Sequence, residues 1–230
     1  KAVSESRRDI AGHPFEAVSL SLIVHPSNPF VPTTHMNLRL FVVENAASQW
    51  HFGGGYDLTP SYGFVEDAEY WHTEAQNAAG AHYEDMKRDC DEYFYLPHRD
   101  EQRGIGGLFF DDLSSNHLNA TFGTIEKIGE SFLPLYTELF ERRCLEPFTD
   151  KNRAFQLFRR GRYAEFNLLF DRGTKYGLQS GRRVENVLAS MPPLAAWAHE
   201  YPIEEGSPEH MLTEFFLKPR DWLAAVNHAT

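Results

Sequence analysis

The sequence predicts an α/β fold of the α+β type: a large, mostly antiparallel β-sheet flanked by helices, in a single domain covering residues 1–230. Three observations support this class. Several segments that alternate between apolar and polar residues precede the first long helical pattern. The helical segments are amphipathic, which suits packing against the face of a sheet. A chain of 230 residues with 42% hydrophobic content can bury one sizeable core.

The predicted strands follow in order along the first half of the chain. Residues 17–24 alternate strictly and form the first strand. A proline-rich loop then leads into a second strand at residues 35–43. Residues 48–59 form a third, aromatic strand, which we expect the glycine triplet at 53–55 to interrupt. Residues 106–113 form a buried fourth strand.

The predicted helices cover residues 66–95, 124–145, 150–170 and 184–191, and a last one begins at Ser207-Pro208. Pro134 should kink the second of these helices. Periodicity leaves residues 163–170 open between helix and strand. Three of these helices should each turn one side toward the core. In the helix at 66–95 this side consists of Ala68, Trp71, Ala75, Ala78, His82, Met86 and Cys90, and in the helix at 124–145 it consists of Ile125, Ile128, Phe132, Leu135 and Leu139. In the last helix the buried residues should be Met211, Leu212, Phe215 and Phe216.

Composition excludes several classes of function. A net charge of -11 argues against general binding to nucleic acid or to anionic membranes. No apolar run approaches the ~20 residues that a membrane span needs. The two cysteines, Cys90 and Cys144, form no C-x-x-C pair and no disulfide framework. We therefore expect a reducing compartment, the cytoplasm by default.

The segment at residues 35–40 carries the strongest chemical signal of any single stretch. In a strand, His35, Asn37 and Arg39 share one face, because side chains alternate with period two. An imidazole, a carboxamide and a guanidinium in a row suit a carboxylate-bearing substrate that needs acid/base chemistry. The alternative interpretation is the polar, solvent-facing side of a half-buried strand.

Several longer stretches together resemble the oxygen-dependent coproporphyrinogen III oxidases, from about residue 10 to the C-terminus. The stretches are HPSNPFVPTTHMNLR at 25–39, WHFGGGYDLTP at 50–60, CDEYF at 90–94, His98-Arg99, RGIGGLFFDD at 103–112 and EFNLLFDRGTKYGL at 165–178. Each stretch is weak alone, whereas their combination in this order is specific.

The resemblance implies the conversion of two propionates of coproporphyrinogen III to vinyl groups in haem biosynthesis, with O2 as co-substrate and no organic cofactor. It also implies a homodimer, which we expect to form through the region from Tyr163 to Pro193. In a eukaryote it makes the mitochondrial intermembrane space an alternative compartment. Family positions suggest His35, Asp171 and Arg39 as catalytic residues. The suggested substrate-binding residues are Ser21, Asn37, Arg39, Arg172, Ser180, Gly181 and Arg182.

Chemistry supports these assignments residue by residue. Propionates need guanidinium partners, and one carboxylate can accept several pyrrole N–H groups while stabilising positive charge on the ring. The structural alternatives are a surface ion pair for each arginine, a pair with Arg172 or a lysine for Asp171, and simple packing for Ser21.

A metal site is the remaining alternative within the resemblance. His25, His35, His72 and His98 match histidines proposed as ligands in some family members, and such a set could hold a divalent metal. Their spacing shows no metal-binding motif, so satisfied structural histidines are the preferred interpretation.

The chain departs from the family pattern in three places. From the resemblance we expect the chain to lack an N-terminal segment that carries further strands in the family. His51 replaces the second of two tryptophans, and Ser180 replaces the first glycine of a Gly-Gly-Arg sequence. These departures keep two other functions open, namely a non-catalytic tetrapyrrole-binding module and a metal-dependent oxygenase.

Overall fold

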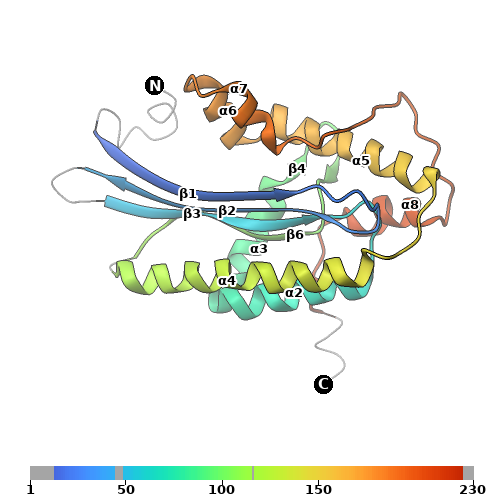
Figure 1. Cartoon of the computed structure of the whole chain (residues 1–230). Helices are drawn as coiled ribbons and strands as arrows, with labels where there is room; N and C mark the ends of the chain where they lie inside the picture. The colour runs from blue at the N-terminus through green and yellow to red at the C-terminus, as the bar shows by residue number, and fades with distance from the viewer. Residues whose placement is uncertain (1–12, 45–48, 116, 225–230) are drawn as a thin grey trace.

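The computed structural model describes residues 13–44, 49–115 and 117–224. Its centre is an antiparallel sheet with the strand order β1-β2-β3-β6. The strands are β1 (Phe15–Val24), β2 (Thr33–Val43), β3 (Gln49–Thr59) and β6 (Gly106–Leu113). Helices α2 and α4 cover one face of the sheet, whereas α5, α6 and α7 lie on the other side (Figure 1). The predicted α+β class and the antiparallel pairing are confirmed.

Strand β3 runs through the glycine triplet, so the expected interruption of the strand was wrong, although its pairing with β6 shifts register between Phe52 and Gly54. The strand continues through Gly54 and Gly55, whose φ angles are 141° and 137°. A Cβ atom at Gly54 would lie 2.0 Å from the carbonyl oxygen of Asn37, and one at Gly55 would lie 1.9 Å from that of Leu108. Glycine is therefore what allows β3 to pair closely with both of its neighbours here.

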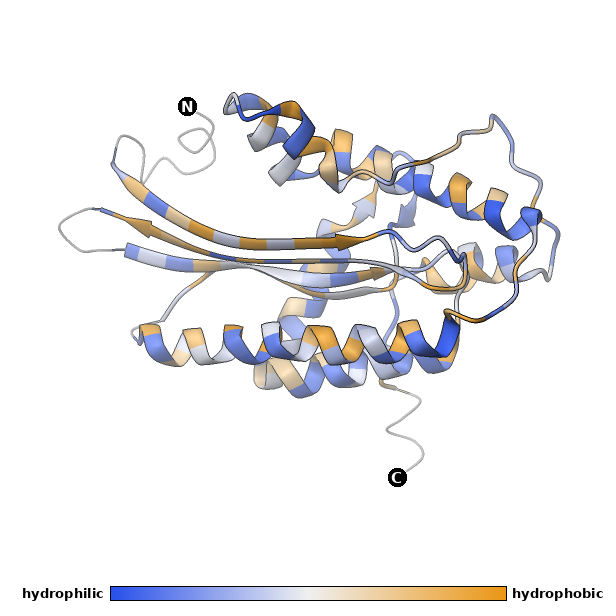
Figure 2. Cartoon of the chain, viewed as in Figure 1, coloured by the Kyte–Doolittle hydropathy of each residue, from blue (hydrophilic) through white to orange (hydrophobic). Residues whose placement is uncertain are grey.

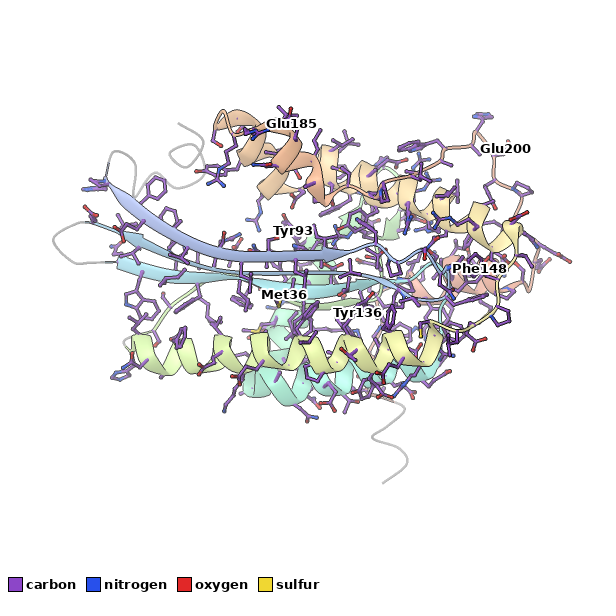
Figure 3. The ribbon with its side chains drawn as sticks, viewed as in Figure 1. Met36, Tyr93, Tyr136, Phe148, Glu185 and Glu200 are labelled. Atoms are coloured by element: carbon purple, nitrogen blue, oxygen red, sulfur yellow. The ribbon has the colours of Figure 1, made fainter. Side chains whose placement is uncertain are left out.

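The main core lies between the sheet and α4 (Leu118–Arg143). All five residues of the predicted α4 stripe, from Ile125 to Leu139, are buried. Met36 points from β2 toward this helix (Figure 3), and a Cβ at Gly129 would lie 2.8 Å from Leu38 Cδ1. Helix α4 begins six residues earlier than predicted and runs through Pro134 as one element. Hydrophobic residues recur along it, separated by hydrophilic ones (Figure 2), as expected for a helix with one buried side.

The long helix predicted over residues 66–95 is divided in the structure. Helix α2 (Val65–Ala79) gives way to the short 3-10 helix η2 (Gly80–His82) and then to α3 (Tyr83–Tyr93). Gly80 has a φ of 57°, which ends α2 in the left-handed region that glycine favours. The break turns His82 outward, so this member of the predicted stripe is exposed and Tyr83 is buried instead.

The second helical layer settles the segment that periodicity left open. Residues 163–170 are helical as far as Leu169, within α5 (Asp150–Leu169). Thr149 and Asn152 close a capping box at the start of α5. The chain continues through α6 (Arg172–Gln179), α7 (Val184–Val187) and η3 (Leu188–Ser190).

The C-terminal part begins with α8 (Pro208–Met211), capped by Ser207 as predicted, and continues as the π-helix η4 (Leu212–Phe216). Leu212 and Phe216 are buried, but Met211 is 45% exposed and was wrongly assigned to the interior. Two short strands not predicted from the sequence, β4 (Tyr95–Leu96) and β5 (Glu101–Gln102), form a separate sheet. Among the described helices, none has the length and apolar character to cross a bilayer.

Candidate active site

The polar residues of β2 lie on the face of the sheet that is turned away from α4. The register places Asn37 opposite Ser21 on β1 and opposite Gly55 on β3. Gly55 in turn lies opposite Phe109 on β6. Because directly paired residues point to the same side of a sheet, all four strands contribute to one surface.

Two of the predicted arginines meet on this surface at a carboxylate that was not predicted. Arg39 donates from Nη2 to Oδ1 of Asp111 in a very short contact. Arg172, at the start of α6, places Nη2 2.5 Å from the other oxygen, Oδ2. A strand residue and a helix residue far apart in sequence thus bind one side chain of β6, and they form a cationic pair beside the sheet.

The carboxylate of Asp171 is held by α6 and by a tyrosine of α3. As the N-cap of α6, its Oδ2 accepts hydrogen bonds from the backbone N–H (2.7 Å) and the hydroxyl (2.8 Å) of Thr174. Its Oδ1 accepts from Tyr93 Oη at 2.9 Å. Burial favours the neutral acid, but these hydrogen bonds outweigh burial and hold the pKa of Asp171 below its ordinary value. The predicted alternative, a structural pair with Arg172 or a lysine, is replaced by this cap.

Tyr93 links the two neighbours Asp171 and Arg172. Its oxygen donates to Asp171 and accepts the backbone N–H of Arg172 at 3.1 Å. Its ring stacks on Phe109 with centroids 4.2 Å apart and planes 10° apart. Figure 3 shows Tyr93 on the side of the sheet that faces α5 and α6, opposite to Met36. Burial, followed by the Asp171 charge, raises the pKa of Tyr93 to about 12, so the hydroxyl stays a donor.

His35 is oriented by a buried acid on the adjacent strand. Its Nδ1 lies 3.1 Å from Oδ1 of Asp57. Burial alone would raise the pKa of Asp57, but the charge of Arg103 and the hydrogen bond from His35 hold it below its ordinary value. An ionised Asp57 can only accept, so Nδ1 of His35 carries the proton of this bond. Nε2 is then the nitrogen through which the ring can exchange a proton with a ligand.

Arg103 supplies the charge that keeps Asp57 ionised. It is 2% exposed and donates from Nη2 to Asp57 Oδ2 at 2.7 Å and from Nη1 to Asn167 Oδ1 at 2.9 Å. Its guanidinium also lies 4.0 Å from the ring centroid of Phe94 and 4.5 Å from that of Tyr163. The buried Arg103 and Asp57 therefore form one connected row with the half-buried imidazole of His35, which lies on the polar surface.

The positions next to Asn37 and Arg39 on this face of the sheet are occupied by small residues. Ser19 and Ser21 of β1 lie opposite Arg39 and Asn37, and Gly53 and Gly55 lie opposite the same two residues on β3. Asn37 donates to the Leu20 carbonyl oxygen at 3.4 Å. This strip of hydroxymethyl groups and glycine backbone therefore has few large side chains, and the Arg39 guanidinium lies over Gly53.

The structure does not bring Ser180, Gly181 and Arg182 to the Asp111 pair. These residues follow the C-terminal end of α6, about 12 Å of helix rise from the Asp171 cap. All three are exposed, and the Arg182 guanidinium lies 5.7 Å from the Tyr176 ring centroid. Gly181 has a φ of 72°, which suits the position just after a helix end.

The four histidines of the metal alternative do not converge. Nε2 of His25 lies 3.0 Å from the Ser190 carbonyl oxygen, and Nε2 of His98 lies 2.8 Å from Glu165 Oε2. His72 is buried in the α2 layer between Tyr83 and the Ile105 carbonyl, and burial lowers its pKa to about 3. Within residues 13–44, 49–115 and 117–224, no group of three or more His, Cys, Asp or Glu side chains is placed to hold a metal ion.

Four site residues were missed by sequence reasoning, namely Asp57, Tyr93, Arg103 and Asp111. Each lies inside one of the motifs that carry the family resemblance, at 50–60, 90–94 and 103–112. Membership of a motif was the available signal. The partners of these side chains were not readable, since each pairs with a residue on another element.

Comparison with known protein families agrees with this geometry. The sequence matches the family model described as coproporphyrinogen III oxidase over residues 1–222, nearly the whole chain of 230 residues. The match includes every element that contributes to the surface described above. The chain therefore belongs to the coproporphyrinogen III oxidase family.

Proposed function

We propose that this protein catalyses the oxygen-dependent oxidative decarboxylation of coproporphyrinogen III, giving protoporphyrinogen IX in haem biosynthesis. The observation that carries the proposal is the convergence of Arg39 and Arg172 on one carboxylate, beside Asp171 and on the same surface as His35. A flat macrocycle with four propionates needs cations at its edge and an anion near its centre.

The proposed binding mode follows from charge and shape. Arg39 and Arg172 hold propionate groups by charge-assisted hydrogen bonds, for which the planar guanidinium is suited. Asp171 accepts pyrrole N–H groups, because its ionised carboxylate keeps acceptor capacity beyond its present donors, Thr174 and Tyr93. The ring itself lies over the strip of Ser21, Asn37 and Gly55.

For each propionate the reaction removes one hydrogen and one carboxylate. The C–H bond on the carbon next to the pyrrole breaks, the bond to the carboxylate carbon breaks, and a C=C bond forms as CO2 leaves. The two electrons released reduce O2, which takes up two protons and leaves as hydrogen peroxide. The electron-rich pyrrole reacts with O2 once its N–H proton is displaced, so the substrate supplies the redox chemistry.

The residues of the chain contribute geometry, charge and proton transfer. Nε2 of His35 exchanges a proton with the substrate, while Asp57 holds the other ring nitrogen. The Asp171 anion stabilises positive charge that develops on the oxidised pyrrole, and it is in place before the reaction begins. Positioning of this kind is where enzymes gain a large part of their rate.

The same proposal includes a homodimer formed through the region from Tyr163 to Pro193. Four aliphatic side chains of this region are at least two-fifths exposed, namely Leu168, Leu169, Leu178 and Val184. These residues lie on the successive helices α5, α6 and α7, and exposed aliphatic residues favour contact with a partner. Cytoplasmic location remains part of the proposal, on the ground that both cysteine thiols are free.

The proposal is tested by incubating the protein with freshly reduced coproporphyrinogen III in air and under strict exclusion of oxygen. We expect protoporphyrinogen, hydrogen peroxide and CO2 in air only, and loss of product with Asp171→Asn. Product formed equally without oxygen would exclude O2 as acceptor. Binding of the tetrapyrrole without turnover in air would instead favour the binding-module alternative.

A further inference from the structure

Asp111 occupies the position that the proposed substrate requires for its own acid groups. One oxygen binds Arg39 and the other binds Arg172, so a single protein carboxylate neutralises both cations. A propionate carries the same carboxylate group. We propose that Asp111 competes with the substrate for Arg39 and Arg172, and is thereby a specificity-determining residue of the site. This inference rests on the function proposed above.

The two ion pairs of Asp111, with Arg39 and with Arg172, are accessible to a ligand from solvent. The side chains of Asp111, Arg39 and Arg172 are 26%, 41% and 59% exposed. Ion pairs with this much solvent contact contribute little to stability. An incoming anion can therefore replace Asp111 without a large loss of stability.

The two guanidinium groups have other contacts that hold them once Asp111 is displaced. The Arg172 guanidinium lies 4.8 Å from the Tyr93 ring centroid and 5.5 Å from that of Phe109. The Arg39 guanidinium lies over the backbone of Gly53. A Cβ atom added at Gly53 would be 2.7 Å from Nε and Nη2 of Arg39. The cations are thus placed by aromatic rings and bare backbone, and Asp111 only balances their charge.

A bulge between β3 and β6 determines where the Asp111 side chain points. Gly54 pairs with Phe110 and Phe52 pairs with Leu113, so Asp111 and Asp112 oppose Gly53 alone. Such a bulge re-aims side chains, and Asp112 takes a φ of 53° within it. The two neighbours differ in partner: Asp111 binds the arginines, and Asp112 Oδ1 lies 3.4 Å from His51 Nε2.

Competition by a tethered carboxylate gives selectivity for ligands with several acid groups. A lone carboxylate meets Asp111 as a rival already in place at high effective concentration. Two propionates on one rigid ring can take one guanidinium each and displace Asp111 together. The site should therefore reject small monocarboxylates and porphyrinogens that have lost their propionates, including the divinyl product.

The test compares Asp111→Asn with the wild-type protein, and Asp112→Asn serves as the matched control one residue away. Two anions are titrated: inorganic sulfate, and coproporphyrin III as the stable oxidised form of the substrate. Binding of sulfate is followed by thermal shift, and binding of the porphyrin by thermal shift and by its absorbance. We expect Asp111→Asn to lower the Kd for sulfate by about tenfold, equivalent to about 1.4 kcal/mol, and to lower the Kd for coproporphyrin III by a smaller factor, because several propionates already displace Asp111 together. Asp112→Asn should leave both values near wild type, and Arg39→Gln combined with Asp111→Asn should lose most of the gain.

The outcomes separate this inference from the proposed function. Tighter sulfate binding in Asp111→Asn supports the competition even if coproporphyrin III binds neither protein, a result that would reject the proposed substrate alone. Unchanged or weaker binding of sulfate and porphyrin in the variant would overturn the competition. Circular dichroism verifies folding, and Asp111→Ser provides a second variant that must show the same direction.

Discussion

The guanidinium of Arg39 lies over the backbone of Gly53, the residue paired with it on β3. A Cβ atom at Gly53 would be 2.7 Å from Nε and Nη2 of Arg39 and 2.9 Å from Cζ. The missing side chain is what lets Arg39 cross β3 and reach Asp111 on β6. A glycine at this position therefore determines where a candidate substrate-binding cation lies.

Gly53→Ala should weaken substrate binding with little effect on stability. The three atoms nearest to the added methyl group all belong to the flexible end of Arg39, which moves away from Asp111. We expect KM for coproporphyrinogen III to rise about tenfold, while the free energy of unfolding in urea changes by less than about 1 kcal/mol.

Gly55→Ala is the matched variant with the opposite pattern. Gly55 has a φ of 137°, and its added Cβ would meet the Leu108 carbonyl oxygen at 1.9 Å. The backbone itself must move, so we expect a loss of about 3 kcal/mol in unfolding free energy. Equal destabilisation by the two variants would contradict the role given to Gly53.

Tyr93→Phe should affect the acid side of the pH profile. The change keeps the stacking on Phe109 but removes a hydrogen bond that lowers the pKa of Asp171. The pKa of Asp171 then rises toward its ordinary value, and the carboxylate becomes protonated at a higher pH. We expect the acidic limb of kcat/KM to move to higher pH, with a stability loss of about 1 kcal/mol. A profile that keeps its acidic limb while overall activity falls would remove Tyr93 from the positioning of Asp171.

His35 and Asp57 should separate catalysis from stability. His35→Gln removes a half-buried ring, so we expect unfolding free energy to change by about 1 kcal/mol while kcat falls at least about 100-fold. Asp57→Asn leaves the buried Arg103 without its counter-charge and should cost about 3–5 kcal/mol. Chemical denaturation and initial rates measure the two effects. Wild-type turnover in His35→Gln would exclude the ring from proton transfer.

The stability of wild-type protein should also fall in acid partly through Asp57. Its pKa is lower in the folded state, so the stabilisation is complete above the ordinary aspartate pKa and is lost as pH falls below it.

Glu165 on α5 should make a second acid-dependent contribution to stability. Burial opposes its charge, but hydrogen bonds from Arg99 and His98, with the charge of Arg162, lower its pKa to about 2. Folded and ordinary values of about 2 and 4.5 define the window: stabilisation is present above 4.5 and lost as pH falls toward 2. Glu165→Gln should lower Tm near pH 7 and converge with wild type at about pH 2.

An exposed carboxylate on α4 provides the control for this window. Glu126→Gln removes the same charge from an exposed position, and it should lower Tm near pH 7 less than Glu165→Gln does. Glu165→Gln melting like wild type at neutral pH would show that the network around His98 adds no stability.

The sequence by itself determined the local features of this protein. Alternation placed His35, Asn37 and Arg39 on one strand face, and helical spacing identified the buried stripe of α4. Ser207 as the cap of α8 was readable because a cap depends on neighbours within a few residues. The combined motifs indicated the family that the match over residues 1–222 shows.

Only the tertiary structure decided which groups meet. Arg39 and Arg172 meet at Asp111, a carboxylate that the sequence did not single out, and Asp171 caps α6. The uninterrupted β3 was also decided by its pairing with both neighbouring strands. Periodicity reports which way a side chain points from its own element. The partner it finds depends on the register and the spacing of elements that are distant in sequence.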